Sequence, residues 1–151
     1  MNPEEHLYIL ALKQCKNIGN INLKKLIKNI GSAKKVWKST PQSLLAISGI
    51  GKNSIQNIGN QEFLNFAEKE LKFCEKHDIK IIHQDEESYP KHLLNCDDAP
   101  MILFYKGNLN NELNPVSIVG TRKLTAYGKH FIQDLTQELS GSKVCTISGL
   151  A

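Results

Sequence analysis

One short segment carries the only arginine of the chain. Arg122 follows an apolar run, Val116–Val119, that is typical of a buried strand, and Gly120 and Thr121 lie between them. A guanidinium presents a rigid fork of donors that can hold a phosphate at two points, whereas a lysine acts as a point charge. In a loop between a strand and a helix, this group can hold an anion beside the helix N-terminus. A salt bridge that closes the loop is the alternative interpretation.

A glycine hairpin is the second candidate for phosphate binding. Gly49, Gly51 and Lys52 follow the apolar run 44–47 in the pattern of a helix-hairpin-helix motif. Glycines permit a tight turn and let a phosphate approach the amides at the start of the next helix, and Lys52 adds charge. A weaker copy lies 32 residues earlier, with Asn17 in place of the first glycine; asparagine tolerates a positive φ. Two such hairpins predict a small sequence-independent DNA-binding unit, and helix-packing turns without DNA contact are the alternative.

The net charge of +4 is unevenly distributed along the chain. Between Glu5 and Glu62 there is no acidic residue, yet this interval carries nine lysines. A stretch of this kind can attract phosphates, although a solvated helical face is the commoner reason for a charge run. After residue 80, six Lys and Arg residues stand against eight acidic ones. The candidate polyanion-binding surface therefore lies in the first part of the chain.

Length and composition exclude several other classes of protein. The 151 residues, 40% apolar and 23% charged, suit one sizeable globular domain, or a small domain and part of a second. The four cysteines form no Cys-x-x-Cys pair and the five histidines are scattered, so we expect no metal site and reduced thiols. No apolar run reaches the length of a membrane span and the N-terminus is not signal-like, which predicts a cytoplasmic protein.

Hydrophobic periodicity predicts two domains, an all-helical one at residues 1–77 and an α/β one at residues 78–151. In the first, it predicts three main helices (near 3–15, 23–30 and 60–77) and short ones near Trp37 and after Thr40. In the second, it predicts one helix (126–139) and four strands (79–83, 101–105, 116–119 and 144–147). Strand, helix and strand at this spacing indicate a right-handed βαβ unit of a mostly parallel sheet. Gly120 and Gly128 do not complete a dinucleotide-binding fingerprint, so no nicotinamide or flavin cofactor is expected.

Four segments occur in an order that resembles a known family. They are Tyr89–Leu93, Asp98–Gly107, Val119–Arg122 with Tyr127 and Gly128, and Ile147–Ala151. Together with the two hairpins, they make essentially the whole chain similar to the DNA-processing protein A (DprA/Smf) family. The resemblance implies a SAM-like helical domain followed by the first part of a Rossmann-like domain that binds single-stranded DNA.

The same resemblance implies a function in binding, without catalysis. Members of the family protect incoming single-stranded DNA during natural transformation (competence), load a RecA-type recombinase for DNA recombination, and form homodimers. Carried over to this chain, it implies one phosphate-holding loop at Gly120, Thr121 and Arg122, and the edge of a neighbouring one at Ser148 and Gly149. Both loops follow strand C-termini, where open α/β sheets bind ligands.

The sequence also departs from the family pattern at its end. In the family a glycine, an isoleucine and an aspartate follow the Ser-Gly-Leu-Ala segment, and more than half of the Rossmann-like domain comes after them, whereas this chain stops at Ala151. Parallel strands need both faces covered, and one helix leaves a face bare. We therefore expect an incomplete sheet that favours association, with the dimer and recombinase surfaces largely outside this chain.

Two other functions remain open from the residues alone. A nucleotide-processing enzyme of Rossmann-like fold would need a catalytic acid beside the phosphate loop, and the acids here cluster in polar loops before the expected binding edge (Asp85, Glu86, Glu87, Asp97, Asp98). A helix-hairpin-helix module for duplex DNA, with a non-functional α/β stub, is the other. A duplex preference that depends on Gly49 and Lys52 but not on Arg122 would select this second alternative.

Overall fold

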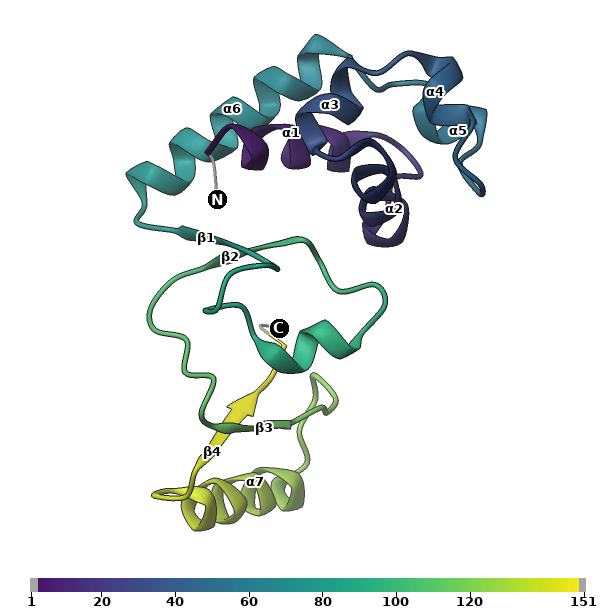
Figure 1. The fold of residues 1–151 in the computed structure, drawn as a ribbon. Coiled ribbons are helices and arrows are strands. Elements are labelled where there is room, and N and C mark those ends of the chain that lie inside the picture. The colour runs from purple at the N-terminus through teal and green to yellow at the C-terminus, as the bar shows by residue number, and fades with distance from the viewer. Residues whose placement is uncertain (1–2, 150–151) are drawn as a thin grey trace. The chain divides into compact units, whose positions relative to one another are not determined.

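A computed structural model describes residues 3–149 (Figure 1). The chain divides into two compact units, between Asn108 and Leu109. We refer to residues 3–108 as the first unit and to residues 109–149 as the second. Asn2, Leu150 and Ala151, which the sequence patterns include, lie outside the described residues. The combination of a helical part with a partial α/β region is confirmed. Within the described residues, no helix has the length and apolar character that crossing a membrane requires.

Six helices build most of the first unit: α1 (Pro3–Gln14), α2 (Asn20–Ile30), α3 (Ala33–Lys38), α4 (Pro41–Leu45), α5 (Lys52–Ile55) and α6 (Gln61–Lys76). Their limits follow local signals. Gly31 ends α2 with a φ of 107°, which glycine adopts without strain. The hydroxyl of Ser32 accepts from the amide of Lys35 at the start of α3, and Asn60 caps α6 in the same way. The predicted helices are thus confirmed to within a few residues.

The core of the first unit is a single apolar cluster between α1, α2, α3 and α6. Its most buried aliphatic members are Ile9, Leu12, Leu23, Leu26, Val36 and Leu44. Figure 1 shows α6 running beside α1, and these two helices are in direct contact. Trp37 packs against the same cluster.

Two strands, β1 (Lys80–His83) and β2 (Ile102–Tyr105), complete the first unit and correct one expectation. They pair antiparallel, with Lys80 opposite Tyr105 and His83 opposite Ile102, and form a two-stranded sheet of their own. The prediction of a single, mostly parallel sheet is therefore wrong for β1 and β2. The connection, residues 84–101, is long enough for a parallel crossover, but it contains only a short 3₁₀ helix (η1, Lys91–Asn95) in place of the α-helix that such a crossover usually carries.

The second unit is the predicted strand–helix–strand. β3 (Asn114–Ser117) and β4 (Val144–Ile147) pair in parallel, with Ser117 opposite Ile147, and α7 (Ala126–Leu139) connects them. The parallel pairing and the helix are confirmed, although β3 begins two residues before the predicted strand. Thr125 caps α7, since its hydroxyl accepts from the amide of Gly128 at 3.1 Å.

The division into units differs from the expected domain boundary between residues 77 and 78. Met101 and Ile102, at the start of β2, are 4% exposed and belong to the helical core cluster. The hairpin of β1 and β2 therefore packs with the helices. The boundary of the domains themselves stays a prediction.

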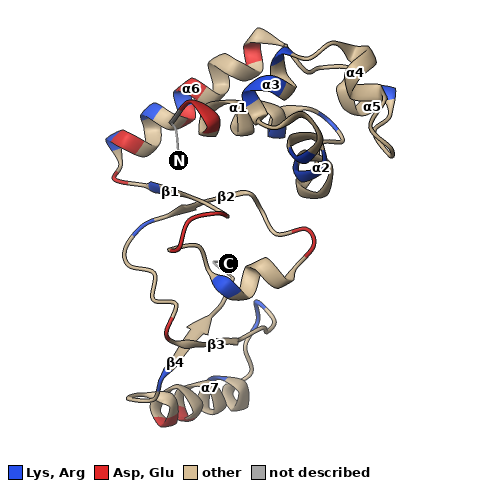
Figure 2. Cartoon of the chain, in the orientation of Figure 1, with Lys and Arg blue, Asp and Glu red and all other residues tan. Residues whose placement is uncertain are grey.

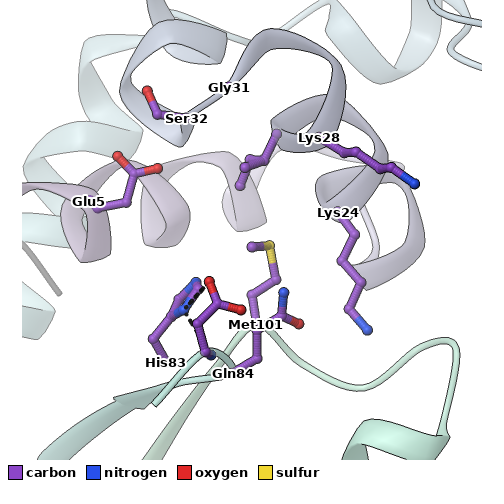
Figure 3. Close-up of a pocket in the computed structure, with 10 residues that line it drawn as sticks. Glu5, Lys24, Lys28, Gly31, Ser32, His83, Gln84 and Met101 are labelled. Carbon is purple, nitrogen blue, oxygen red and sulfur yellow. Dashed lines mark hydrogen bonds and ion pairs between the residues drawn. The ribbon is translucent and has the colours of Figure 1, made fainter.

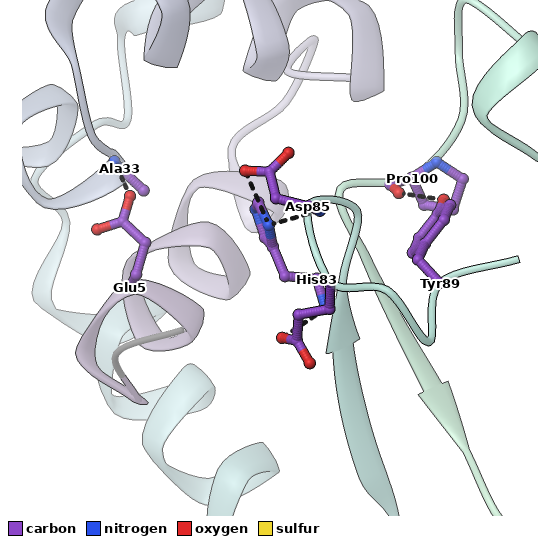
Figure 4. Close-up of polar contacts among 7 residues, drawn as sticks. Glu5, Ala33, His83, Asp85, Tyr89 and Pro100 are labelled. Carbon is purple, nitrogen blue, oxygen red and sulfur yellow. Dashed lines mark hydrogen bonds and ion pairs between the residues drawn. The ribbon is translucent and has the colours of Figure 1, made fainter. Parts of the chain in front are cut away.

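A buried histidine, His83, ends β1. His83 is 2% exposed, and its Nδ1 accepts from the amide of Asp85 at 3.2 Å (Figure 4). Burial lowers the pKa of His83 and of His6 below 6.5, although nearby carboxylates oppose the shift. Below pH 6.5 the unfolded chain therefore binds more protons than the folded one, so stability falls as the pH falls through this range.

We expect the urea midpoint of the first unit, followed by Trp37 emission, to drop between about pH 7.5 and about pH 5. The His83→Asn variant should show a smaller drop, because the asparagine oxygen can replace Nδ1 as an acceptor without titrating. An equal drop in both proteins would show that other groups cause the acid sensitivity.

Candidate nucleic-acid interface

The carboxyl ends of β3 and β4 bring two loops together in the second unit. The amide of Ile118 donates to the carbonyl oxygen of Ile147 at 2.8 Å, which extends the ladder beyond the strands. The loop 118–125 and the residues Ser148 and Gly149 therefore leave the same edge of the sheet. A pocket of about 890 Å³ lies at this edge, lined by Ile118, Val119, Gly120, Thr121, Arg122, Leu124, Gly128, Lys129, Phe131, Ile132, Gln133, Ser148 and Gly149.

All five residues predicted for this site line the pocket: Gly120, Thr121, Arg122, Ser148 and Gly149. The Arg122 side chain is exposed, and in the part of the chain that the structure describes it forms no ion pair with a carboxylate. The alternative interpretation, a salt bridge that closes the loop, is therefore not supported. The guanidinium remains available to an anion from solution.

The loop around Arg122 is held by its own hydroxyl groups. Thr121 donates from Oγ1 to the carbonyl oxygen of Lys123 at 2.7 Å, which folds the backbone at Arg122 into a turn. Thr125 then caps α7, a helix of 14 residues whose N-terminal end carries a partial positive charge. A Cβ at Gly128 would lie 3.3 Å from the Thr125 hydroxyl, so a larger residue there would crowd the cap. The guanidinium of Arg122, the amides of its loop and the start of α7 therefore lie in one small region.

Apolar side chains also line this pocket. Leu124, Phe131 and Ile132 line it, and Phe131 is 54% exposed. Phe131 was not among the residues predicted for the site. Amphipathic spacing predicts which face is apolar, but it does not show that the face borders an open pocket. Tyr127, the aromatic residue nearest to Arg122 in the sequence, is 79% exposed and does not line the pocket.

The two predicted hairpins of the first unit share one backbone geometry. Asn17 and Gly49 have positive φ values of 67° and 79°, which confirms the prediction that Asn17 replaces a glycine in the first copy. Each is followed by a buried isoleucine, Ile18 or Ile50, whose amide donates to the carbonyl three residues earlier at 3.1 Å. A glycine with extended backbone then caps the next helix in both copies.

The surroundings of the two hairpins differ. In the first copy, Asn20 and Lys24 donate to the carbonyl oxygens of Asp98 and Asp97 at 2.8 and 3.1 Å, so the chain itself contacts the start of α2. In the second copy, Gly49, Gly51 and Lys52 are all exposed. The second hairpin is therefore the more open of the two.

Two lysines, Lys25 and Lys52, lie at the second hairpin. Lys25 of α2 donates from Nζ to the carbonyl oxygen of Ser48 at 3.2 Å, which places a second cation beside Gly49 and Lys52. Figure 2 shows blue lysine segments on α2, α3 and α5 and no acidic residue on α2 to α5. This surface can attract a polyanion over several contacts.

A second cavity, of about 550 Å³, lies within the first unit between α1, α2 and the end of β1 (Figure 3). Lys24 and Lys28 line it, but Glu5 and Asp85 do so as well, which offsets their charge. Glu5 already accepts a hydrogen bond from the amide of Ala33 (Figure 4). Within residues 3–149, no group of three or more side chains could hold a metal ion. This cavity therefore offers neither a net positive field nor a set of metal ligands.

Comparison with known proteins points to one family. A family profile described as DNA recombination-mediator protein A matches residues 80–151, which include the whole pocket of the second unit. Protein Smf of Synechocystis is 31% identical over 160 residues, which cover 100% of this chain and 39% of that protein. DNA processing protein DprA of Bacillus subtilis is 37% identical over 75 residues, or 48% of this chain and 25% of that protein. DNA processing protein DprA of Streptococcus pneumoniae is 39% identical over 67 residues, 44% of this chain and 23% of that protein. The chain thus spans well under half the length of these relatives.

Proposed function

Because this chain is a partial region of the DNA recombination-mediator protein A (DprA/Smf) family, we propose that it binds single-stranded DNA at the pocket beside Arg122. The observation that carries the proposal is the position of the only arginine, exposed and without a carboxylate partner among the described residues, at the carboxyl edge of two parallel strands. The binding would serve DNA uptake in natural transformation, the process in which the family takes part.

The proposed contact starts from the phosphate backbone. Arg122 holds one phosphate at two points, and amides after Gly120 add hydrogen bonds. The positive end of α7 lies at the far end of the same loop. Phe131 lines the same pocket and is the aromatic ring on which a base would stack, and base stacking on aromatic rings tolerates any sequence. The result is binding without sequence preference.

Binding fits this pocket better than catalysis. Hydrolysis of a glycosidic bond in a nucleotide would need an acidic residue next to the phosphate loop. None of the residues that line the pocket in the described part of the chain is an acid or a histidine. The acids named as candidates, Asp85 to Glu87 and Asp97 to Asp98, belong to the first unit. We therefore assign no catalytic role to this site.

The broader functions of the family are proposed on the same basis. We assign a SAM-like helix-hairpin-helix domain to residues 1–77 and the first part of a Rossmann-like domain to residues 78–151; the matched family region, which begins at residue 80, supports this boundary. Homodimer formation, loading of a RecA-type recombinase and a cytoplasmic location are proposals for the full-length protein.

Chemical modification of the single arginine tests the proposal directly. Phenylglyoxal reacts with guanidinium groups, and this chain has one, so mass spectrometry reads a single site. We expect saturating oligo-dT to slow the modification of Arg122 strongly, and the modified protein to bind the oligomer weakly. Equal modification rates with and without the oligomer would contradict contact at Arg122.

The open hairpin supports a second candidate, binding of duplex DNA by the helical unit. Its positive-φ glycine, the neighbouring Lys25 and the acid-free surface of α2 to α5 are the observations in favour. We expect Lys52→Ala to weaken duplex binding several-fold and to reduce its salt dependence by about 0.9 in the log–log slope, the value for one phosphate contact. Fluorescence anisotropy against a labelled duplex measures both. Lys34→Ala is the matched control, because Lys34 is already paired with Glu4; an equal loss in the two variants would contradict a specific contact at the hairpin.

A further inference from the structure

Helix α6 contains a short internal repeat. Residues 66–69 read Phe-Ala-Glu-Lys and residues 73–76 read Phe-Cys-Glu-Lys, seven positions apart. Seven residues are close to two helical turns, so equivalent positions of the two copies lie on nearly the same face, about 10 Å apart along the axis. Each copy therefore presents the same side chains in the same direction.

The small residue of each copy faces the core and the phenylalanine faces outward. Ala67 is fully buried and Cys74 is 5% exposed, whereas Phe66 is 41% and Phe73 51% exposed. His77, at the end of the helix, stacks on Phe73 with a distance of 4.2 Å between ring centroids and 37° between the ring planes. Three rings thus form an exposed aromatic row, which we call the α6 stripe (Phe66, Phe73 and His77).

Lysines border this stripe at a fixed offset. Lys69 and Lys76 follow the two phenylalanines by three positions, the spacing of neighbours on a helix surface. Both are exposed, and neither forms an ion pair within the described residues. The repeated acids, Glu68 and Glu75, are each two positions past a phenylalanine and so face away from it.

Two further acids, Glu62 and Glu70, lie four positions from Phe66 and so are its neighbours on the helix surface. Glu62 lies in the first turn of α6, where the helix dipole favours a carboxylate. Glu70 is half-buried against the core side, and its charge is felt by the Cys74 thiol. Of these charged groups, Lys69 and Lys76 are the two that repeat at the same offset from each phenylalanine.

We propose that the α6 stripe is a second contact surface for single-stranded nucleic acid. Unpaired bases stack on Phe66 and Phe73, and the phosphates between them pair with Lys69 and Lys76. The alternation of aromatic ring and cation favours a single strand. A duplex keeps its bases stacked inside the helix, and a purely apolar partner would make no favourable contact with the two lysines. The inference rests on the proposed function only for the class of ligand, since none of its residues lines the Arg122 pocket.

The test compares an oligo-dT with an abasic oligomer of the same length. The double variant Phe66→Leu/Phe73→Leu of the full chain should bind oligo-dT about tenfold more weakly and the abasic oligomer unchanged, because only stacking is lost. The double variant Lys69→Gln/Lys76→Gln should weaken both, with a log–log salt slope about 1.4 smaller, the value for two contacts to a single strand. Phe104→Leu is the matched control, since Phe104 is 45% exposed on β2. Trp37 emission verifies that each variant keeps a folded first unit.

Photo-crosslinking separates this surface from the Arg122 pocket. An oligomer with 5-iodouracil should crosslink to peptides that contain Phe66 or Phe73, and these crosslinks should persist in the Arg122→Ala variant. Oligo-dT binding equal to that of the Phe104→Leu control, or crosslinks confined to the second unit, would overturn the inference and leave the Arg122 site standing. A phenylalanine variant with unchanged DNA binding but reduced self-association would overturn it in favour of a protein-binding surface. Absence of all single-strand binding in the unmodified chain would overturn both proposals together.

Discussion

Replacing Arg122 with alanine is expected to weaken the binding of single-stranded DNA roughly tenfold to a hundredfold, the usual effect of losing a charged hydrogen-bonded contact. The loss should be the same for oligomers of different sequence, because a phosphate contact carries no sequence information. The log–log salt slope should become about 0.7 smaller, the value for one contact to a single strand. Anisotropy titrations at several salt concentrations give all three quantities.

Two further variants make this prediction specific. Lys123→Ala removes an adjacent cation that does not line the pocket, so its effect should be several times smaller. Arg122→Lys keeps the charge but loses the fork of donors, and its affinity should lie between those of the alanine variant and the unmodified chain. Equal losses of affinity for Arg122→Ala and Lys123→Ala would show that Arg122 contributes only to the general positive electrostatic field of the surface.

The largest effect on stability is expected from Leu26→Ala, which should lower the free energy of unfolding of the first unit by about 2–5 kcal/mol. Leu26 is fully buried in α2, at the centre of the core cluster, so truncation leaves a cavity that the neighbouring helices cannot fill. Urea unfolding followed by Trp37 emission measures the change, because Trp37 is the only tryptophan and packs against this core.

The control for this prediction lies in the second unit. Leu124 is 66% exposed, so Leu124→Ala should change the Trp37 transition by less than about 0.5 kcal/mol. A Leu26→Ala transition that coincides with that of Leu124→Ala would mean that the helical core is not organised around Leu26.

Local features of the fold were predictable because local chemistry determines them. The positive φ of Asn17, the end of α2 at Gly31 and the inward face of α6 all follow from single residues or from a helical period. The position of Gly120 at the same pocket as Ser148 and Gly149 was also predictable from the sequence, since parallel strands joined by one helix must place their carboxyl ends at the same edge of the sheet.

Long-range pairing was not predictable in the same way. The apolar runs at β1 and β2 show that strands exist, but they do not show which strand each one joins. Ile102 reads equally well as part of a parallel sheet, and in the structure it packs into the helical core. Exposure was equally hidden, because the period of α6 identifies the buried Ala67 and Cys74 but does not show whether Phe66 and Phe73 are covered. The aromatic repeat of α6 is visible in the sequence, but only the exposed fractions of Phe66 and Phe73 indicate a contact surface.

The most direct test of the account compares single-stranded and duplex DNA on the unmodified chain. Fluorescence anisotropy with a labelled oligo-dT and with a duplex of matched length, over a series of salt concentrations, measures both affinities. The account predicts a clear preference for the single strand, with affinity that falls steeply as salt increases. Absence of binding, or equal weak binding to both ligands, would contradict the assignment of single-strand binding to this region of the family.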